Sequence, residues 1–230
     1  MHTFYVEGTS LSPEDAKHAF RVLRLKSGDE VTALTGDTRW SARIAAISDK
    51  GGEVELLEKL PSNESPLSLT LYQGLPKAEK LEFLAQKLTE LGVKRLVPVH
   101  MEYSVAKAEG DKRNDRLRKI AREAVKQCRR SETMEITSPL SWKDAVADMA
   151  RRELMIVPWE NAESLRMADL RRECPDAKDI GILIGPEGGI SEAEIAGCGA
   201  RPVTLGPRIL RAETAAVTAA ALAMAFWGDV

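Results

Sequence analysis

The chain has 230 residues, of which 43% are hydrophobic and 30% charged, with a net charge of −2 at pH 7. This length allows one large domain or two small ones, and the composition argues against a disordered chain. No apolar run reaches the ~20 residues that span a bilayer, and the first residues do not resemble a signal peptide. Three widely spaced cysteines, Cys128, Cys174 and Cys198, argue against a disulfide framework or a zinc site. We therefore expect a cytoplasmic protein with no membrane segment and no metal.

The first part of the chain predicts a small β domain. Ser12-Pro13 followed by two acids is typical of a helix start, and we expect this helix to reach about residue 24. Three β-like runs follow, at residues 30–35, 39–47 and 53–57, separated by glycine turns. The polar segment 61–66 is bounded by two prolines and is the best linker. The first domain is thus expected to be a β-barrel or curled sheet of residues 1–66.

Residues 67–230 alternate between strand-like and helical patterns. The strand-like runs are residues 67–72, 95–99, 154–157, 180–184 and 202–205. Helices are expected at 78–91, 113–130 and 211–227; the first two have apolar residues at i, i+3, i+4 and i+7. This alternation predicts an α/β domain with a mostly parallel sheet, whose ligand lies beyond the carboxyl ends of the strands. The last helix is rich in alanine and permits close approach of another helix, from the same domain or from a second copy.

Basic residues are concentrated in one stretch. Residues 107–130 contain ten lysines and arginines against four acids, a net charge of +6 in a chain of net −2. Such a stripe is typical of a localised contact with a polyanion, and equally of a solvated helix face. Charge alone leaves both interpretations open.

Three loops at strand ends carry the most specific patterns. Residues 184–190 read IGPEGGI and lead into a capping box that begins at Ser191. This loop lacks the Lys-Ser/Thr pair of a P-loop and the spacing of a dinucleotide-binding fingerprint. Residues 205–215 read LGPRILRAETA, with two arginines and a glutamate at a helix start, and residues 157–160 read VPWE. Taken singly, each loop has a plain structural interpretation as a turn or a polar first turn.

Together, these loops resemble the signatures of the RsmE family of ribosomal RNA uridine-N3 methyltransferases, within the SPOUT superfamily. The resemblance extends over nearly the whole chain, and further blocks occur in the family's order at residues 18–24, 28–29, 73–77, 90–93, 102–105 and 127–130. The chain departs from the family at Tyr103, where the family commonly has Arg, and at Lys126 and Arg129, where it usually has Glu and Gly. Lys77-Ala78 also replaces a more common pairing with Gly. These departures bear on RNA contact and not on the cofactor loops.

The resemblance implies the fold and the reaction. It implies a PUA-like N-terminal β-barrel (residues 1–66) and a C-terminal SPOUT methyltransferase domain (residues 67–230) with a trefoil knot. It further implies S-adenosyl-L-methionine (SAM) as cofactor, S-adenosyl-L-homocysteine as product, and a homodimer. The implied target is N3 of a uridine in the decoding region of 16S rRNA, in free rRNA or in the small ribosomal subunit.

The resemblance also implies the site residues. We expect Arg211 to be the cation beside uracil O2 or O4, and Glu213 to be the base or an orienting group. The residues expected to bind SAM are Pro158, Trp159, Ile184, Gly185, Glu187, Gly188, Gly189, Leu205, Gly206, Ile209, Leu210 and Thr214. The residues expected to contact RNA are His18, Arg21, Arg24, Lys77, Arg122, Arg129, Arg130 and Arg208.

Two other functions stay in view. One is a related SPOUT methyltransferase that acts on another base or on the ribose, which the identity of the modified nucleoside would distinguish. The other is a non-catalytic RNA-binding or ribosome-assembly factor on the same fold, which would not need to bind SAM.

Overall fold

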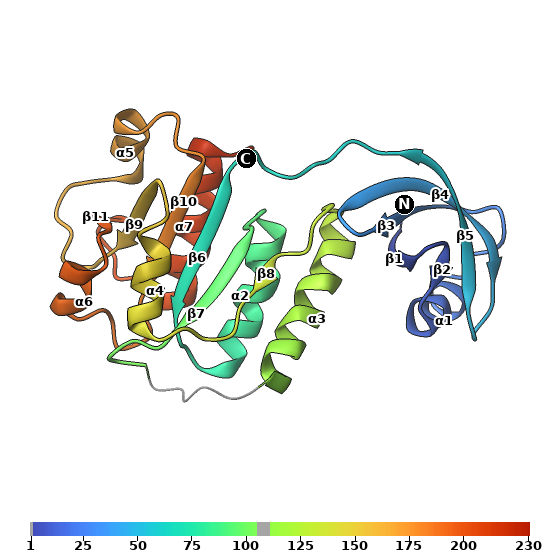
Figure 1. Ribbon diagram of the computed structural model, residues 1–230, viewed down its shortest axis with the longest axis horizontal. Helices are drawn as coiled ribbons and strands as arrows, with labels where there is room; N and C mark the ends of the chain where they lie inside the picture. Colours follow the sequence, from blue (N-terminus) through green and yellow to red (C-terminus); the bar gives the residue numbers. More distant parts are fainter. Residues whose placement is uncertain (1, 105–110) are drawn as a thin grey trace. The chain divides into compact units, whose positions relative to one another are not determined.

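The computed structural model describes residues 2–104 and 111–230, and the chain forms two compact units (Figure 1). The first, here called the barrel unit, runs to Glu64 and also includes Glu123–Thr133. The second, the sheet unit, comprises Ser65–Arg122 and Met134–Val230. A single boundary after residue 66 therefore does not describe the division, because a later stretch of chain belongs to the barrel unit.

The barrel unit is a closed five-stranded barrel. Its strands are β1 (Thr3–Glu7), β2 (Ser10–Leu11), β3 (Glu30–Thr35), β4 (Thr38–Ile47) and β5 (Gly52–Lys59). Their order is β1-β2-β5-β4-β3, and parallel pairing of β1 with β3 closes the barrel. Two register shifts between β4 and β5 allow these long strands to curl. The three predicted strands are confirmed, but β1 and the two-residue β2, joined by a turn at Gly8, were not predicted.

Helix α1 (Pro13–Arg21) lies between β2 and β3. Its start is as predicted, because the Ser12 hydroxyl accepts a hydrogen bond from the Asp15 amide at 3.1 Å. Its Ala16 and Ala19 join the core formed by the inward-facing residues of the strands.

The sheet unit contains six parallel strands. They are β6 (Ser68–Gly74), β7 (Arg95–Val99), β8 (Glu135–Ile136), β9 (Leu154–Pro158), β10 (Asp179–Ile184) and β11 (Arg201–Val203). Their order is β11-β9-β10-β6-β7-β8, which confirms the predicted parallel sheet. Strand β8 was missed, since two residues show no periodicity.

Helices cover both faces of this sheet (Figure 1). One face packs against α2 (Ala78–Glu90), α3 (Asp111–Cys128), α5 (Met167–Glu173) and α7 (Ala212–Trp227). The other face packs against α4 (Trp142–Met149) and α6 (Glu192–Gly197). Successive residues of a strand point to opposite faces, so in β6 Leu71 belongs to the first core and Tyr72 to the second. No helix in the described ranges is long and apolar enough to cross a membrane.

The strand order positions the site. Strands β11, β9 and β10 are adjacent and parallel, so their carboxyl ends lie side by side at one edge. The three loops singled out in the sequence are those that follow these three strands. Residues far apart in the chain therefore meet where a parallel sheet places its ligand.

Candidate functional site

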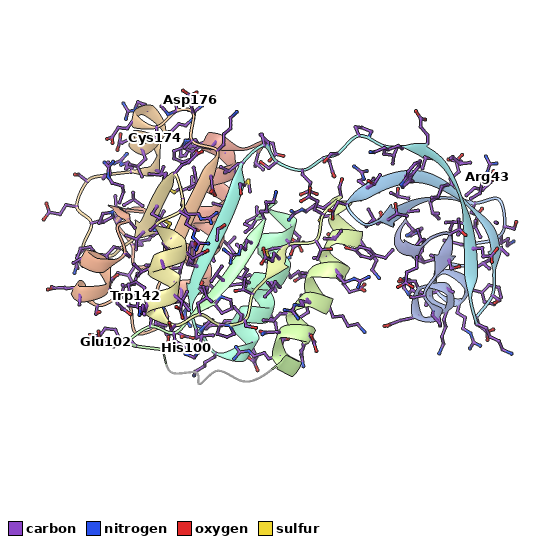
Figure 2. The ribbon with its side chains drawn as sticks, viewed as in Figure 1. Arg43, His100, Glu102, Trp142, Cys174 and Asp176 are labelled. Carbon is purple, nitrogen blue, oxygen red and sulfur yellow. The ribbon has the colours of Figure 1, made fainter. Side chains whose placement is uncertain are left out.

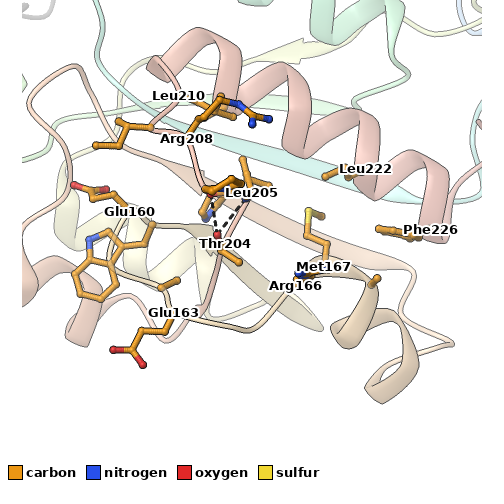
Figure 3. A pocket seen from close by; sticks show the side chains of 18 residues that line it. Glu160, Glu163, Arg166, Met167, Thr204, Leu205, Arg208, Leu210, Leu222 and Phe226 are labelled. Carbon is orange, nitrogen blue, oxygen red and sulfur yellow. Dashed lines mark hydrogen bonds between the residues drawn. The ribbon is translucent and has the colours of Figure 1, made fainter.

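A cavity of about 870 Å³ lies between the loops after β9 and β11 and helix α7 (Figure 3). This volume is in the range of pockets that hold a ligand the size of a nucleoside derivative. The residues lining it are Pro158, Trp159, Glu160, Ala162, Glu163, Arg166, Met167, Ala168, Thr204, Leu205, Gly206, Pro207, Arg208, Ile209, Leu210, Ala215, Leu222 and Phe226.

The two ends of the cavity differ in character. Figure 3 shows Met167, Leu222 and Phe226 toward one end, and Glu160 and Glu163 toward the other. Apolar side chains suit an aromatic ring system, and carboxylates suit a positive charge. SAM has both features, so the lining fits the cofactor that the sequence implies.

The loop after β11 depends on a glycine. Gly206 has φ of +115°, a conformation that residues with a side chain rarely adopt. The Thr204 hydroxyl fixes this turn, since it accepts a hydrogen bond from the Gly206 amide at 3.1 Å. A Cβ at Gly206 would meet no atom within 4 Å, so the glycine is required by the backbone conformation and not by crowding.

The glycine loop, defined as residues 185–189 after β10, lies beside this cavity. Gly189 has φ of +82°, and a Cβ there would lie 3.2 Å from Oε1 of the cavity residue Glu160. The loop is supported from β6, where the buried Gln73 side chain donates to the Gly185 carbonyl at 3.2 Å. The glycine loop thus touches a wall of the cavity without contributing to its lining.

The capping box after this loop forms as predicted. The Glu194 carboxylate accepts from the Ser191 amide at 3.1 Å, and the Ser191 hydroxyl accepts from the Glu194 amide. The same buried carboxylate accepts from the Glu102 amide at 2.9 Å. Glu102 follows β7 and is labelled in Figure 2 close to His100. Glu194 therefore ties the segment after β7 to the start of α6.

The two expected catalytic residues lie at the start of α7. Arg211 is the exposed N-cap residue, and among the described residues its guanidinium has no hydrogen-bond partner. Glu213 lies in the first helical turn, where its Oε2 atom is 3.0 Å from Nζ of Lys80. Burial raises the pKa of Glu213, but its own amide and the Lys80 charge outweigh burial and lower that pKa overall. Glu213 is therefore ionised at neutral pH.

Lys80 also pairs with the glycine loop. Its Nζ lies 3.2 Å from Oε1 of Glu187. Burial acts to raise the pKa of Glu187, yet hydrogen bonds from its own amide, Lys80 and Lys77 lower it overall. Sequence reasoning missed Lys80, since in the sequence it is an ordinary polar residue on an amphipathic helix.

The structure divides the expected SAM contacts into two groups. Those that line the cavity are Pro158, Trp159, Leu205, Gly206, Ile209 and Leu210. Those outside its lining are Ile184, Gly185, Glu187, Gly188, Gly189 and Thr214. Ile184 faces the core, so only its backbone is available to a ligand. The expected RNA contact Arg208 also lines the cavity.

Several lining residues were not foreseen. Leu222 and Phe226 are four apart on α7, a spacing that marks one face of a helix. Arg166 and Met167 lie at the start of α5, which is only seven residues long and gives no clear periodicity. The helical spacing of Leu222 and Phe226 was therefore visible in the sequence, whereas nothing in the sequence indicated Arg166 and Met167.

The expected RNA contacts in the barrel unit are exposed. His18, Arg21 and Arg24 all have solvent-accessible side chains. Arg21 pairs with Asp49 at 2.6 Å, in an ion pair that is open to water. Arg24 has φ of +56°, which is uncommon for a residue with a side chain. Lys77, in the sheet unit, is also exposed and precedes α2.

The basic stretch is not a uniform solvated face. Arg122 and Arg129 are exposed, but Arg130 is buried, with its Nη2 atom 2.7 Å from Glu64. Lys126 is likewise mostly buried and pairs with Asp15 at 2.9 Å. We therefore assign Arg130 a structural role within the barrel unit in place of the expected RNA contact. The beginning of the stretch, residues 107–110, and Val105 of an earlier block lie outside the described residues.

Family models match both parts of the chain. Residues 63–224 match the RNA methyltransferase domain, and residues 11–57 match the RNA methyltransferase PUA domain. Among curated proteins, the chain is 31% identical over 224 residues to "Ribosomal RNA small subunit methyltransferase E" of Bacillus subtilis, covering 90% of this chain and 85% of that protein. It is 30% identical to the Aquifex aeolicus protein of the same name, covering 98% of this chain and all of that protein.

Solved structures agree with these matches. The chain superimposes on ribosomal RNA small subunit methyltransferase E from Neisseria gonorrhoeae bound to SAM with a TM-score of 0.88 and 29% identity, covering 100% and 99% of the two chains. A Legionella pneumophila protein solved in complex with SAM gives a TM-score of 0.86 and 32% identity, covering 100% and 98% of the two chains. The chain therefore belongs to the ribosomal RNA small subunit methyltransferase E family.

Proposed function

We propose that this protein transfers a methyl group from SAM to N3 of a uridine in the decoding region of 16S rRNA. The observation that carries the proposal is the cavity beside the start of α7, where Arg211 and Glu213 lie. Its lining fits SAM, and two similar structures contain SAM. Family membership points to small-subunit rRNA as the substrate, and the uridine and its N3 atom are expectations from the sequence.

SAM would be held mainly by the loops after β9 and β11. Leu205 and Leu210 offer apolar surface, and the backbone around Gly206 is open to the ligand. Glu160 and Glu163 place negative charge at one end of the cavity. When bound, SAM supplies an electrophilic methyl group on a positively charged sulfur, and S-adenosyl-L-homocysteine is left after transfer.

The uracil needs activation, because its N3 atom carries a proton at neutral pH. That N–H bond must break before or while the N–CH₃ bond forms, and the charge left on the ring spreads onto O2 and O4. Arg211 is the proposed stabiliser of this charge, and its exposure at the positive end of the sixteen-residue helix α7 supports that role. A donor of this kind contributes about 10²–10³-fold to the rate.

Glu213 serves to orient groups in this proposal. Its carboxylate is paired with Lys80, and its pKa is lowered, so it is a weak acceptor for a proton from uracil. A carboxylate held in this way fixes the start of α7, where Arg211 is the N-cap residue. The proton then leaves to water or to another group.

RNA contact is proposed for the exposed basic side chains of the protein. The candidates in the barrel unit include the exposed side chains of His18, Arg21 and Arg24. Arg122 and Arg129 are exposed basic residues near the end of α3. Lys77 and Arg208 are the candidates beside the cavity loops. Phosphate contacts of this kind make binding strongly dependent on salt.

We further propose a homodimer with a trefoil knot in the sheet unit, in the cytoplasm. The less buried positions Thr218 and Ala221 of α7 support the dimer, since they are uncharged and small enough for a second helix to approach. The knot follows from family membership alone. The cytoplasm follows from the proposed substrate, a ribosomal subunit.

The proposal is tested by titrating the protein with SAM in a calorimeter and by measuring transfer of labelled methyl groups. The acceptors are small ribosomal subunits that lack the modification and, in parallel, free 16S rRNA. We expect SAM binding and transfer to one of these acceptors. Absence of both activities would contradict the proposal and favour a non-catalytic RNA-binding factor.

A further inference from the structure

Lys80 has no role in the reaction described above, yet it joins three parts of the site. It lies in the first turn of α2, the helix that follows β6. Its Nζ atom is 3.2 Å from Glu187 in the glycine loop after β10, and 3.0 Å from Glu213 in α7 after β11. One ammonium group thus connects segments that follow three different strands.

The arrangement of the two carboxylates depends on the positive charge of Lys80. Two carboxylates share a single cation, and without it they would repel each other. The three side chains are only 21–28% exposed, so solvent screens these charges less than it would on an open surface. Glu187 is also fixed by the Lys77 amide at 3.4 Å, so the glycine loop is fastened to the start of α2 at two points.

We propose that Lys80 is a positioning residue for methyl transfer. By holding Glu187 and Glu213 together, it sets the glycine loop and the start of α7 at the separation that catalysis requires. Arg211 lies two residues before Glu213, so a shift of Glu213 displaces the guanidinium that stabilises the uracil charge. The catalytic part of this inference rests on the proposed function, and the cofactor-binding part is measurable separately.

The test compares three single variants. Lys80→Met removes the charge at similar length, Lys80→Arg retains the charge, and Lys87→Met is the matched control. Lys87 lies on the same helix and forms an ion pair at 2.9 Å with Glu90. Each variant is checked by thermal unfolding, and Lys80→Gln replaces Lys80→Met if the latter does not fold.

We expect Lys80→Met to lower kcat for methyl transfer to small subunits by about 10–100-fold, the effect of misplacing a reacting group by roughly 1 Å. SAM affinity should fall by a smaller factor, about 3–10-fold, because the loops after β9 and β11 that line the cavity keep their other contacts. Lys80→Arg should restore most of both losses, and Lys87→Met should stay within about twofold of the wild type.

A double-mutant cycle identifies the cause. Adding Glu187→Gln to Lys80→Met removes the repulsion between the carboxylates, so SAM affinity should recover while kcat stays low. Unchanged kcat and SAM affinity in Lys80→Met would overturn the proposal. Equal losses in Lys80→Arg and Lys80→Met would also overturn it, since charge would then be irrelevant. If the wild type transfers no methyl group, the proposed function fails, and SAM affinity alone still decides the role of Lys80.

Discussion

The barrel unit and the sheet unit each contain a cluster of shared charges, and the two clusters differ in burial. In the barrel unit, the Glu64 carboxylate accepts hydrogen bonds from the Arg130 guanidinium at 2.7 and 3.0 Å and from the Ser131 and Glu132 amides at 2.7 and 2.9 Å. The Arg130 and Glu64 side chains are only 7% and 14% exposed. The Lys80 cluster of the sheet unit is about a quarter exposed and lies next to the loops of the cavity.

The difference in burial between the two clusters implies different roles, one in stability and one in activity. A buried carboxylate with four donors fastens residue 64, at the end of the first segment, to the later stretch 123–133. Removing a partner there leaves an uncompensated buried charge. A partly exposed cluster contributes less to stability, but it controls the geometry of the loops that it joins. We therefore expect mutations in the barrel cluster to change unfolding, and mutations around the cavity to change turnover.

The largest effect on stability is expected from Arg130→Met. It leaves Glu64 buried without its guanidinium partner, and about 3–5 kcal/mol of unfolding free energy should be lost. Denaturant unfolding measures this change. Arg21→Met is the control, because the Arg21–Asp49 pair is 58% and 38% exposed and should contribute less than about 1 kcal/mol. Equal losses of unfolding free energy in the two variants would contradict a stabilising role for the buried Glu64–Arg130 pair.

Arg211→Ala should have the largest effect on turnover. Loss of the cation beside the uracil ring is expected to lower kcat about 10²–10³-fold, while SAM affinity stays within a few-fold of the wild type. Single-turnover methyl transfer and calorimetry measure the two quantities. Normal turnover with normal SAM binding would exclude Arg211 as the stabilising group.

Gly206→Ala should have an intermediate effect, because it strains a loop that lines the cavity. The strain of φ at +115° should destabilise the turn by about 1–3 kcal/mol, and relaxation of the turn should weaken SAM binding. Calorimetry measures the affinity. The matched change Gly197→Ala is at a glycine without positive φ and with open space around its Cβ position, and it should leave SAM binding unchanged.

The smallest effect is a pH dependence of stability. Burial raises the pKa of Glu64, but hydrogen bonds from Arg130 and the Glu132 and Ser131 amides lower it overall from the ordinary value of 4.5. A lowered pKa in the folded state contributes stability above that ordinary value, and this stability is lost as the pH falls through the folded pKa. Between about pH 5 and pH 3, unfolding free energy should therefore fall more steeply in the wild type than in Glu64→Gln. Parallel curves would contradict this assignment.

Local patterns predicted much of the fold. Strands β3 and β10 were visible as apolar or alternating runs between turns, and α2 through its apolar spacing. Three strands were missed: β1, which has five residues, and β2 and β8, which have two residues each and are specified by their neighbours. The return of 123–133 to the barrel unit was also unpredictable, because Arg130 reads as one more base in a basic stretch.

In the candidate site, too, local sequence patterns indicated some residues, and others depended on the tertiary fold. The glycine loop, Arg211 and Glu213 were singled out through the family resemblance of the three loops, and their roles stay predictions. Lys80 was not, since its partners Glu187 and Glu213 are distant in sequence and meet it only through the strand order. Contacts that depend on the order of the strands can be identified only in the folded structure.

The most direct test of the central claim is the identity of the methylated nucleoside. Small ribosomal subunits that lack the modification are incubated with the protein and labelled SAM, and their rRNA is digested and analysed by mass spectrometry against nucleoside standards. We predict N3-methyluridine as the labelled product, formed about 10²–10³-fold more slowly by Arg211→Ala under the same conditions. A different methylated nucleoside, or SAM binding with no transfer to either subunits or free 16S rRNA, would contradict the account.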